Sequence, residues 1–484
     1  MRHEHGNDFF NRTSELNTIR NALRSDRAEL VVMYGRRGVG KSELLVRAIP
    51  PHSFYYQATA QLMQQQLGDL TQELNRVADG QAIIGRLESF PAVLAAVTDL
   101  AQRRKDEPFV FVIDEFPYLV QADPGVETTI QKWWDTSRAS TPNLKVFLAG
   151  SHVSWMHEHT LDEHGPLQNR RTRQIDVAPL DYLHAADFYP HFSAVDKVRA
   201  FAIWGGLPRH LRDLDSSLDL WESIRQTLLD PDSRLFVEPD WLRFTDLRAD
   251  RVYTSLVRVI AMGQHTPGDI AKAVGRNSAT DISAQLGRLV EIGIVARVNA
   301  TTSRVDARSP AHYYISDPFL AFWYRFIDSY RNMIRRGQAD AVLARIRLEL
   351  DLFVSQYVFE GVCREWLWLQ LGQGNLSIDQ DIAEIGLWWG GAKGNQDEID
   401  VVALSIQRET VIVGECKWTN APMDMRDLSG LRLGLATAQK DLNPVLNPWR
   451  ICFARGGFHP DLVAEAAHVD NRIVLVDPDQ LYTR

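Results

Sequence analysis

The sequence predicts a multidomain α/β protein in which a phosphate-binding parallel sheet leads and a second, smaller α/β unit ends the chain. At 484 residues the chain is too long for one hydrophobic core, and its length alone predicts two to four domains. In the first third, apolar β-rich runs alternate with helical stretches, which is typical of a parallel sheet covered on both faces. One of these runs leads directly into a glycine-rich phosphate-binding motif at residues 35–42.

The bulk composition is that of an ordinary globular protein, with 45% hydrophobic and 24% charged residues. The net charge of −9 excludes a uniformly basic nucleic-acid coat, although a local basic face can still bind a polyanion. Cys363, Cys416 and Cys452 form no CxxC pattern, so we expect reduced thiols and no structural zinc site. The N-terminus lacks the apolar core of a signal peptide, and no window reaches the roughly 18 apolar residues that span a bilayer. We therefore expect a cytoplasmic protein with no membrane partner.

The first 180 residues are predicted to form the sheet domain. Its strands are expected at residues 30–34, 54–57, 109–114 and 144–149. The run Phe109–Asp114 is apolar until its last residue, as a central buried strand should be. From residue 181 to 248 the pattern turns helical and contains the turn-forming segment Trp204–Pro208, so we expect a helical lid there.

Residues 249–316 have the pattern of a winged helix. Thr266 is placed to cap the second helix with Pro267 at its first position, and Gly275 is placed to end it. The expected helices and wing strands are 253–262, 266–274, 278–292 (the recognition-helix candidate), 294–298 and 313–315. A helical connector at 317–352 then leads to the last α/β unit, 353–484. In that unit we expect a helix at 354–369 and strands at 399–404, 410–415 and 473–477.

The phosphate-binding motif matches GxxxxGK[ST] in full. Its glycines let backbone N–H groups curl around phosphates, and the following helix offers its positive N-terminal end. We expect Lys41 to reach the β- and γ-phosphates and Ser42 to ligate Mg²⁺, with ATP and Mg²⁺ as cofactors. The residues expected around the phosphates are Gly35, Arg36, Arg37, Gly38, Val39, Gly40, Lys41, Ser42 and Glu43.

Polar residues after two of the expected strands complete the ATP site. Asp114 would hold the magnesium ion through water, and Glu115 would orient and deprotonate the attacking water. Ser151, after the strand at 144–149, is placed to sense the γ-phosphate. Arg170 is the candidate arginine finger in a basic cluster with Arg171 and Arg173; such a cluster can equally be a solvated face.

Several motifs together resemble the archaeal-type P-loop ATPases, which are relatives of the AAA and STAND ATPases. They are FNRTSEL from Phe10, IDEFPYL, LAGSHVSWM, PLQNRRT and GGLPRHL. The resemblance implies that the segment before the P-loop contacts adenine and that the GG-x-P turn approaches the nucleotide. Arg12, Glu15 and Pro208 thereby become nucleotide-proximal candidates. The family usually reads PLYGR where this chain reads PLQNR; Arg170 is retained and the Tyr-Gly pair is not.

The C-terminal unit contains a second candidate metal site. Glu415 and Lys417 are two apart on an expected strand, so their side chains share one face. If the preceding strand pairs with it in a hairpin, Asp400 reaches the same place, and Glu360 on the preceding helix can add a third acidic ligand. Such a group can hold one or two Mg²⁺ or Mn²⁺ ions and activate water against a phosphodiester. Alternating charges on an exposed strand would give the same letters.

A resemblance supports the metal-site reading. The segment ISDPFLAFWYRFI at 315–327 resembles the start of a domain of unknown function that accompanies these ATPases and is similar to PD-(D/E)XK nucleases. This resemblance implies a restriction-endonuclease-like fold for the C-terminal unit. Trp388 and Trp389, just before the motif, are either core residues or an aromatic platform for bases. The recognition-helix candidate carries only Arg288, with Arg276 before it and Arg304 and Arg308 on the wing, so DNA contact and a lid or interaction role both stay open.

Three functions fit these patterns. The first is an ATP-fuelled enzyme that binds nucleic acid, DNA in preference to RNA, and cuts it at the C-terminal site. The second is a STAND-like switch in which ATP/ADP exchange controls a nucleotide-dependent homo-oligomer. The third is a transcription regulator that uses the winged helix, with the ATPase as its sensor.

Overall fold

The computed structural model describes residues 11–78, 85–161, 165–239, 251–303, 311–378, 380–390 and 397–483. The chain divides into two compact units. The first comprises Met1–Leu180 together with Leu207–Arg209, and the second comprises Asp181–Gly206 and His210–Arg484. No helix among the described residues is both long and apolar enough to cross a membrane.

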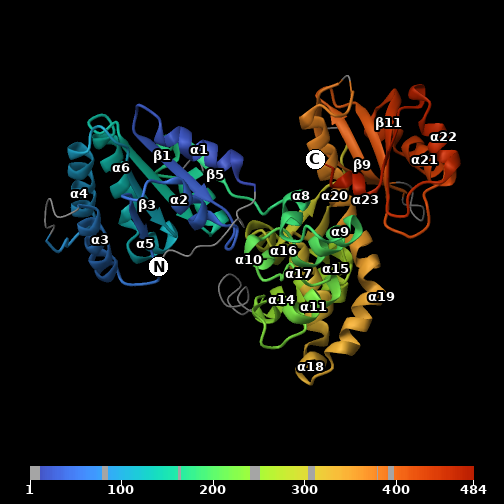
Figure 1. Cartoon of the computed structure of the whole chain (residues 1–484), viewed down its shortest axis with the longest axis horizontal. Coiled ribbons are helices and arrows are strands. Elements are labelled where there is room, and N and C mark those ends of the chain that lie inside the picture. The colour runs from blue at the N-terminus through green and yellow to red at the C-terminus, as the bar shows by residue number, and fades with distance from the viewer. Residues whose placement is uncertain are drawn as a thin grey trace. The chain divides into compact units, whose positions relative to one another are not determined.

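The first unit is built on a parallel five-stranded sheet in the order β2-β3-β4-β1-β5, with helices on its two faces (Figure 1). Its strands are β1 Glu29–Tyr34, β2 Phe54–Gln57, β3 Phe109–Asp114, β4 Leu144–Gly150 and β5 Arg173–Asp176. The helices are α1 Thr13–Leu23, α2 Lys41–Ala48, α3 Met63–Ala78, α4 Phe90–Arg103, α5 Phe116–Ala122 and α6 Gly125–Ser137. The four predicted strands are confirmed. The edge strand β5 was not predicted, because its sequence RQID has no apolar run.

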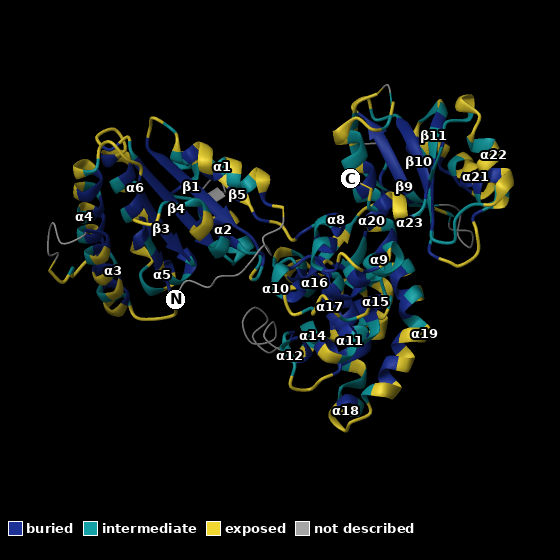
Figure 2. Cartoon of the chain, viewed as in Figure 1, coloured by how far each residue is buried: buried dark blue, intermediate teal, exposed yellow. Residues whose placement is uncertain are grey.

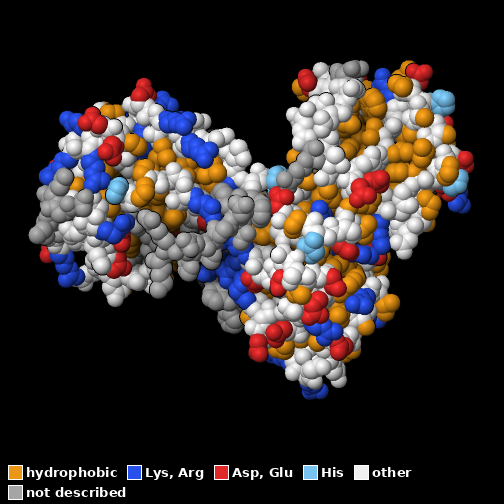
Figure 3. All heavy atoms as spheres, viewed as in Figure 1, with side chains coloured by type: hydrophobic (Ala, Val, Ile, Leu, Met, Phe, Trp, Pro, Cys, Tyr) orange, Lys and Arg blue, Asp and Glu red, His pale blue; other side chains and the backbone are white. Residues whose placement is uncertain are grey.

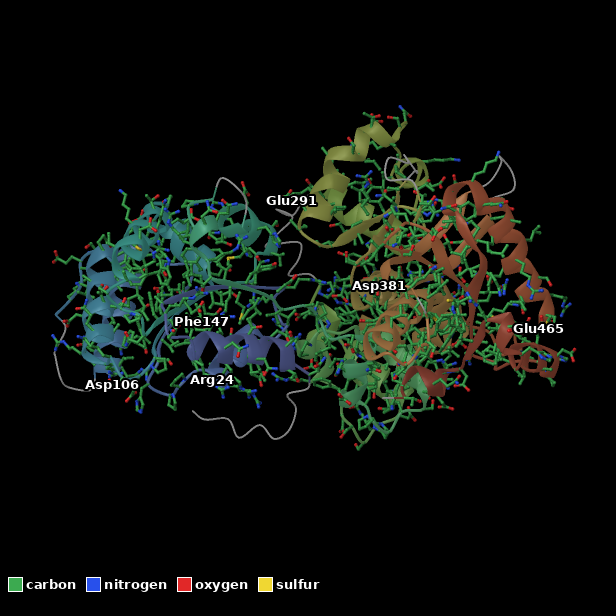
Figure 4. The ribbon with its side chains drawn as sticks, turned by 90° about the horizontal axis from the view of Figure 1, so that it is seen from above. Arg24, Asp106, Phe147, Glu291, Asp381 and Glu465 are labelled. Atoms are coloured by element: carbon green, nitrogen blue, oxygen red, sulfur yellow. The ribbon has the colours of Figure 1, made fainter. Side chains whose placement is uncertain are left out.

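Every residue of β1, β3 and β4 is buried, which explains why these strands are apolar apart from Glu29, Asp114 and Lys145 (Figure 2). Successive side chains enter two different cores because they point to opposite faces of the sheet. Leu30 and Val32 pack in one core with residues of α3, α4 and α6, whereas Val31 and Phe147 pack in the other with residues of α1 and α2. Figure 4 labels Phe147 and Arg24, the residue directly after α1. Helix α1 packs on the same side of the sheet as Phe147.

The second unit begins with helices and a small hairpin. The helices include α9 Ala194–Trp204, α11 Leu220–Leu228, α14 Arg251–Ala261, α15 Pro267–Ala273, α16 Ser283–Glu291 and α17 Pro318–Phe322. The hairpin pairs β6 Val295–Val298 with β7 His312–Ile315. The predicted cap is confirmed, since the Thr266 hydroxyl accepts a hydrogen bond from the Asp269 N–H at 3.2 Å. Arg304 and Arg308 lie outside the described residues.

A long helix pair connects this region to the second sheet. We expected one helix at 354–369, but the structure has α19 Ala339–Tyr357 followed at once by α20 Phe359–Gln373. The boundary placed at residue 352 therefore falls inside α19. The break at Val358 leaves the helical region (φ −130°, ψ −42°), which no residue type in the sequence signals.

The second sheet has the order β12-β11-β10-β9-β8. Its strands are β8 Ile382–Gly390, β9 Asp397–Ser405, β10 Thr410–Lys417, β11 Pro444–Ala454 and β12 Ile473–Val476, and its helices include α20, α21 Met425–Leu442 and α22 Pro460–Ala466. Strands β8, β9 and β10 pair antiparallel, whereas β10, β11 and β12 pair parallel. The predicted strands β9, β10 and β12 are confirmed. The sheet is separate from that of the first unit.

The segment that follows β6 is hydrogen-bonded to the edge of this second sheet. The Thr301 N–H donates to the Leu387 carbonyl on β8 at 2.8 Å, and the Ser303 N–H donates to the Asp441 carbonyl at 2.7 Å. The Arg408 guanidinium donates to the carbonyls of Thr302 and Ser303. One backbone carbonyl of the edge strand β8 is thus paired from within the chain.

Trp388 is a core residue, since it is 1% exposed and packs with Ile399 and Leu431, so an aromatic platform cannot include it. We predict that Trp388→Ala lowers the free energy of unfolding by about 3–5 kcal/mol, because it leaves a large cavity. Urea unfolding followed by circular dichroism measures this. Trp368→Ala is the control, since that side chain is 44% exposed, and it should cost far less. Equal midpoints for the two variants would show that Trp388 is not part of the core.

Candidate functional site

The turn between β1 and α2 has a backbone that requires glycine at defined positions. A Cβ atom on Gly35 would lie 2.3 Å from the Val177 carbonyl oxygen, which leaves no room for a side chain. Gly40 is left-handed, with φ of 98°, directly before α2 begins at Lys41. The turn therefore brings its backbone to the positive N-terminal end of α2, where an anion is stabilised.

Lys41 is buried under this turn, with 5% of its surface exposed. Its Nζ donates hydrogen bonds to the carbonyls of Gly35 at 2.6 Å and Arg36 at 3.3 Å. Burial lowers the pKa of Lys41, and the negative charges of Glu115 and Asp114 partly oppose that effect. A bound polyphosphate would supply the negative charge that this buried ammonium lacks.

Asp114 is fully buried at the end of β3 and collects three donors. Its Oδ2 accepts from the Ser42 and Tyr55 hydroxyls at 2.6 Å each, and its Oδ1 accepts from the Glu115 N–H at 2.9 Å. A carboxylate and a hydroxyl oxygen in contact are the oxygen ligands that Mg²⁺ prefers, so Ser42 and Asp114 fit the ion. Burial and the Asp114 charge raise the pKa of Tyr55 far above its usual value, so its hydroxyl stays a donor.

Glu115 is held by Ser151 in a strained conformation. Its φ of 54° lies in the left-handed region, which is unusual for a residue with a side chain. The Ser151 hydroxyl donates to Glu115 Oε1 at 2.9 Å and to Oε2 at 2.7 Å, and the Ser151 N–H lies 3.3 Å from Oε2. The structure thus brings these two predicted residues together at the ends of β3 and β4.

Arg12 and the turn at residues 207–209 also lie against the P-loop. Arg12 is 8% exposed and donates to the Val39 carbonyl and to Glu15, each at 3.0 Å. The N–H of Arg209, directly after Pro208, donates to the Gly38 carbonyl at 3.3 Å. The structure therefore places Arg12 and Pro208 beside the phosphate loop. Glu43, on α2, pairs with Arg47 at 3.0 Å.

Arg170 is held elsewhere in the first unit. It donates to Asp135 on α6 at 2.7–3.0 Å and to the Pro166 carbonyl at 3.0 Å. These hydrogen bonds lower the pKa of Asp135. Its role as an arginine finger stays a prediction.

The second sheet gathers carboxylates from three elements. Oxygen atoms of Glu360 on α20 and of Glu398 and Asp400 on β9 lie within 4.8 Å of one another. Glu415 follows on the neighbouring strand β10, where Gly414 pairs with Val401, so the predicted hairpin is present. Glu398 was not proposed as a ligand. The signal was there, because residues 398 and 400 are two apart on one strand and share a face.

Burial and mutual repulsion raise the pKa values of this acidic cluster, by which we mean Glu360, Glu398, Asp400 and Glu415. The pKa of Glu360 rises to about 8 through burial and the Asp400 charge, and that of Asp400 to about 7 through burial and the Glu415 charge. The pKa of Glu415 rises to about 7 through burial and the Asp427 charge. A divalent cation would neutralise this repulsion, so the donor set fits a hard metal ion.

Basic and polar partners surround the acidic cluster. Arg364 Nη1 donates to the Asp400 carbonyl at 2.6 Å and to Glu360 at 3.3 Å. The Cys416 N–H donates to Asp400 Oδ2 at 2.7 Å. Lys417 forms an ion pair with Asp427 on α21. Neither Arg364 nor Asp427 was predicted, since both are brought to the site only by helix packing.

A parallel sheet whose first strand runs into this glycine turn, with a buried acid at the end of β3, two strands away in the sheet, defines a P-loop ATPase domain. Residues 9–214 match the family described as an ATPase domain predominantly from Archaea, and residues 323–429 match the family described as archaea bacterial proteins of unknown function. The chain therefore carries an archaeal-type, ATP-binding ATPase domain followed by a domain of the second family. The resemblance inferred from its motifs is confirmed.

Individual relatives are similar over most of the chain. An uncharacterized protein of Methanocaldococcus jannaschii is 28% identical over 413 residues, which are 85% of this chain and 87% of that protein. The Walker-type ATPase of Pyrococcus abyssi is 19% identical and covers 66% of this chain and 96% of its own, with a TM-score of 0.48. The ORC2 protein of Aeropyrum pernix is 13% identical, with coverages of 70% and 96% and a TM-score of 0.43.

The acidic cluster makes the stability of the metal-free protein depend on pH. Each carboxyl group with a raised folded pKa stabilises the fold below its unfolded pKa of about 4, and this contribution is lost as the pH rises through about 7 to 8. We therefore predict that the melting temperature falls between about pH 5 and pH 8.5, and that Glu360→Gln makes this fall smaller.

Thermal unfolding at a series of pH values, with and without Mg²⁺, measures both effects. Mg²⁺ should raise the melting temperature more at the high-pH end, because only deprotonated carboxylates bind it. Glu384→Gln is a control on the same sheet, in a half-buried ion pair with Arg408. If Glu360→Gln and Glu384→Gln change the pH dependence equally, the acidic cluster is not its source.

Proposed function

We propose that this chain hydrolyses ATP at the P-loop and uses the nucleotide state to control metal-dependent cleavage of nucleic acid by its C-terminal unit. The observation that carries the proposal is the acidic cluster, in which Glu360, Asp400 and Glu415 are half-buried and Glu398 is exposed, and whose repulsion a divalent cation would relieve. Mg²⁺ or Mn²⁺ held by Glu360, Asp400 and Glu415 would activate a water against a phosphodiester. Glu398 would add a further ligand, and Lys417 would stabilise developing negative charge.

At the ATP site, each residue has a role that its contacts support. Lys41 would exchange its bonds to the loop carbonyls for bonds to the β- and γ-phosphates, and Ser42 and Asp114 would hold Mg²⁺. Glu115 would activate the attacking water. Because Ser151 now holds the Glu115 carboxylate, a γ-phosphate that draws the Ser151 hydroxyl away would release Glu115 for this task. Arg170 is retained as a finger candidate.

A shared carboxylate supports the coupling of the two sites. Asp351 on α19 accepts hydrogen bonds from Arg199 on α9 at 3.0 Å, from Trp418 Nε1 at 3.1 Å, and lies 2.7 Å from Arg455 Nη1. The Arg455 N–H in turn donates to the carbonyl of Lys417 at 2.9 Å. Asp351 thus joins the lid helix α9 to the end of the strand that carries the motif lysine.

The other end of α9 leads to the P-loop. The helix ends at Trp204, followed by Gly205 in a left-handed conformation with φ of 65°. The chain then reaches residues 207–209, which contact Gly38. A change at the phosphates would therefore be transmitted along one helix to Asp351.

The second candidate is a STAND-like switch with a non-cleaving C-terminal module. The ion pair of Lys417 with Asp427 favours it, because a lysine neutralised there is not committed to a scissile phosphate. The switch requires a mass that changes with ADP, ATP or no nucleotide. Light scattering measures that mass, and an unchanged value in all three states would count against the switch.

We predict Mg²⁺- or Mn²⁺-dependent cutting of plasmid or branched DNA by the full chain, lost by a factor of at least about 100 in Asp400→Ala. Gel analysis of the products, with RNA of the same sequence as a second substrate, measures it. Asp397→Ala is the matched control, since Asp397 begins the same strand without joining the carboxylate group. Equal nicking by the wild type and Asp400→Ala would reject cleavage at this site.

We predict that Asp351→Asn leaves basal ATP hydrolysis and nucleotide-free cleavage within about twofold of wild type but removes the effect of ATP on cleavage. The amide keeps the size of the carboxylate and loses the charge that holds three elements together. Coupling of this kind is commonly about 1–3 kcal/mol, or roughly 5- to 150-fold. Asp328→Asn, which breaks an ion pair with Arg258 in the same unit, is the control. ATP dependence that persists in Asp351→Asn would show that the coupling runs elsewhere.

A further inference from the structure

Four aromatic rings, from the segment before α15, from β7 and from β8, form a ladder beside the second sheet. The rings of His312 on β7 and Trp389 on β8 are stacked, with centroids 4.2 Å apart and planes within 9°. The ring of His265 stacks on that of Tyr314 at 4.3 Å, and the Tyr314 hydroxyl lies 3.5 Å from His312 Nδ1. All four side chains are half-buried, so the ladder keeps part of its surface open to a ligand.

This ladder borders the acidic cluster. Trp389 is the cross-strand partner of Glu398, whose carboxylate lies within 4.8 Å of those of Glu360 and Asp400. Tyr314 lies within electrostatic range of the same carboxylates, because burial and the charges of Glu398 and Glu360 raise its pKa to about 12. Rings from residues 251–315 and carboxylates from the second sheet therefore form one composite surface.

The contacts of the hairpin and of α16 do not favour the way in which a winged helix usually binds duplex DNA, with a helix in the major groove and cations on the phosphates. Backbone groups of Thr301, Thr302 and Ser303 are already bonded to the edge of the second sheet or to Arg408. The single cation of α16, Arg288, is ion-paired with Glu291. On the face of the second unit drawn in Figure 3, basic and acidic side chains are interspersed, which gives little attraction to a duplex backbone.

We propose, building on the proposed cleavage activity, that the His312–Trp389 stack binds an unpaired base beside the scissile phosphate. The substrate class is then nucleic acid with unpaired nucleotides, such as a single strand, a flap or a branch, in preference to continuous duplex. Base–aromatic stacking supplies affinity without reading sequence and needs no cation. Burial lowers the pKa of His312, so the stack is neutral at pH 7. The buried Trp389 Nε1 has no acceptor among the described residues, so a base or phosphate oxygen can supply one after a small shift.

The test measures binding and cutting separately with the full chain. Labelled single-stranded, flapped and blunt duplex DNA of one sequence are titrated with wild type, Trp389→Ala, Trp389→Phe and His312→Ala, and anisotropy is recorded with Ca²⁺ in place of Mg²⁺. Trp449→Ala is the matched control, because Trp449 is a half-buried tryptophan of the same sheet on β11, under Arg472. Cleavage is then measured on the same preparations with Mg²⁺.

We expect Trp389→Ala to weaken binding of the single-stranded and flapped forms roughly 5- to 150-fold, the value of one stacked base. His312→Ala should weaken it in the same direction, Trp389→Phe should retain most of the affinity, and Trp449→Ala should match wild type. The inference is overturned if wild type binds blunt duplex as tightly as the flap, or if Trp389→Ala and His312→Ala both bind like Trp449→Ala. Should wild type bind flaps through Trp389 yet cut nothing, the cleavage proposal fails and the base-binding site stands.

Discussion

The site of the first unit depends on the buried carboxylate of Asp114, at the end of β3. With no exposed surface, Asp114 is stable only because Ser42, Tyr55 and the Glu115 N–H donate to it. Those bonds fix the start of α2 against β3. In the second sheet, burial and the charges of neighbouring carboxylates raise the pKa values of Glu360 and Asp400 instead. We propose that both places bind a cation, one within the ATPase domain and one beside the proposed nucleic-acid-binding surface.

In the second unit, the carboxylate of Asp351 joins elements that are far apart in the sequence. Asp351 ties α9, the long helix α19 and the end of β10 together through three donors. The segment after β6 is bonded in turn to the edge strand β8, so the hairpin and the second sheet meet along one border. The substrate site that we propose is built from these two sequence regions, and the coupling path that we propose ends beside Lys417.

Local signals carried most of what the sequence predicted correctly. The P-loop, the apolar run ending at Asp114 and the Thr266 cap each depend on a few adjacent residues, and all appear as expected. Tyr55, Glu398 and the partners on α20 and α21 could not be placed, because only strand pairing and helix packing bring them to the sites. Strand β8 was missed for a related reason, since its sequence carries two tryptophans and glycines in place of an alternating pattern. Trp388 lies in the core and Trp389 is half-exposed, because successive side chains of a strand point to opposite faces of the sheet.

Direct observation of a cation in the acidic cluster tests the central claim most directly. Mn²⁺ binding to the full chain without nucleotide can be followed by electron paramagnetic resonance, as the loss of the free-ion signal. The account predicts that the wild type and Ser42→Ala bind Mn²⁺, and that the double variant with both Glu360→Gln and Asp400→Asn does not. Equal Mn²⁺ binding by the wild type and the double variant would contradict a metal site there, and with it the proposed cleavage chemistry.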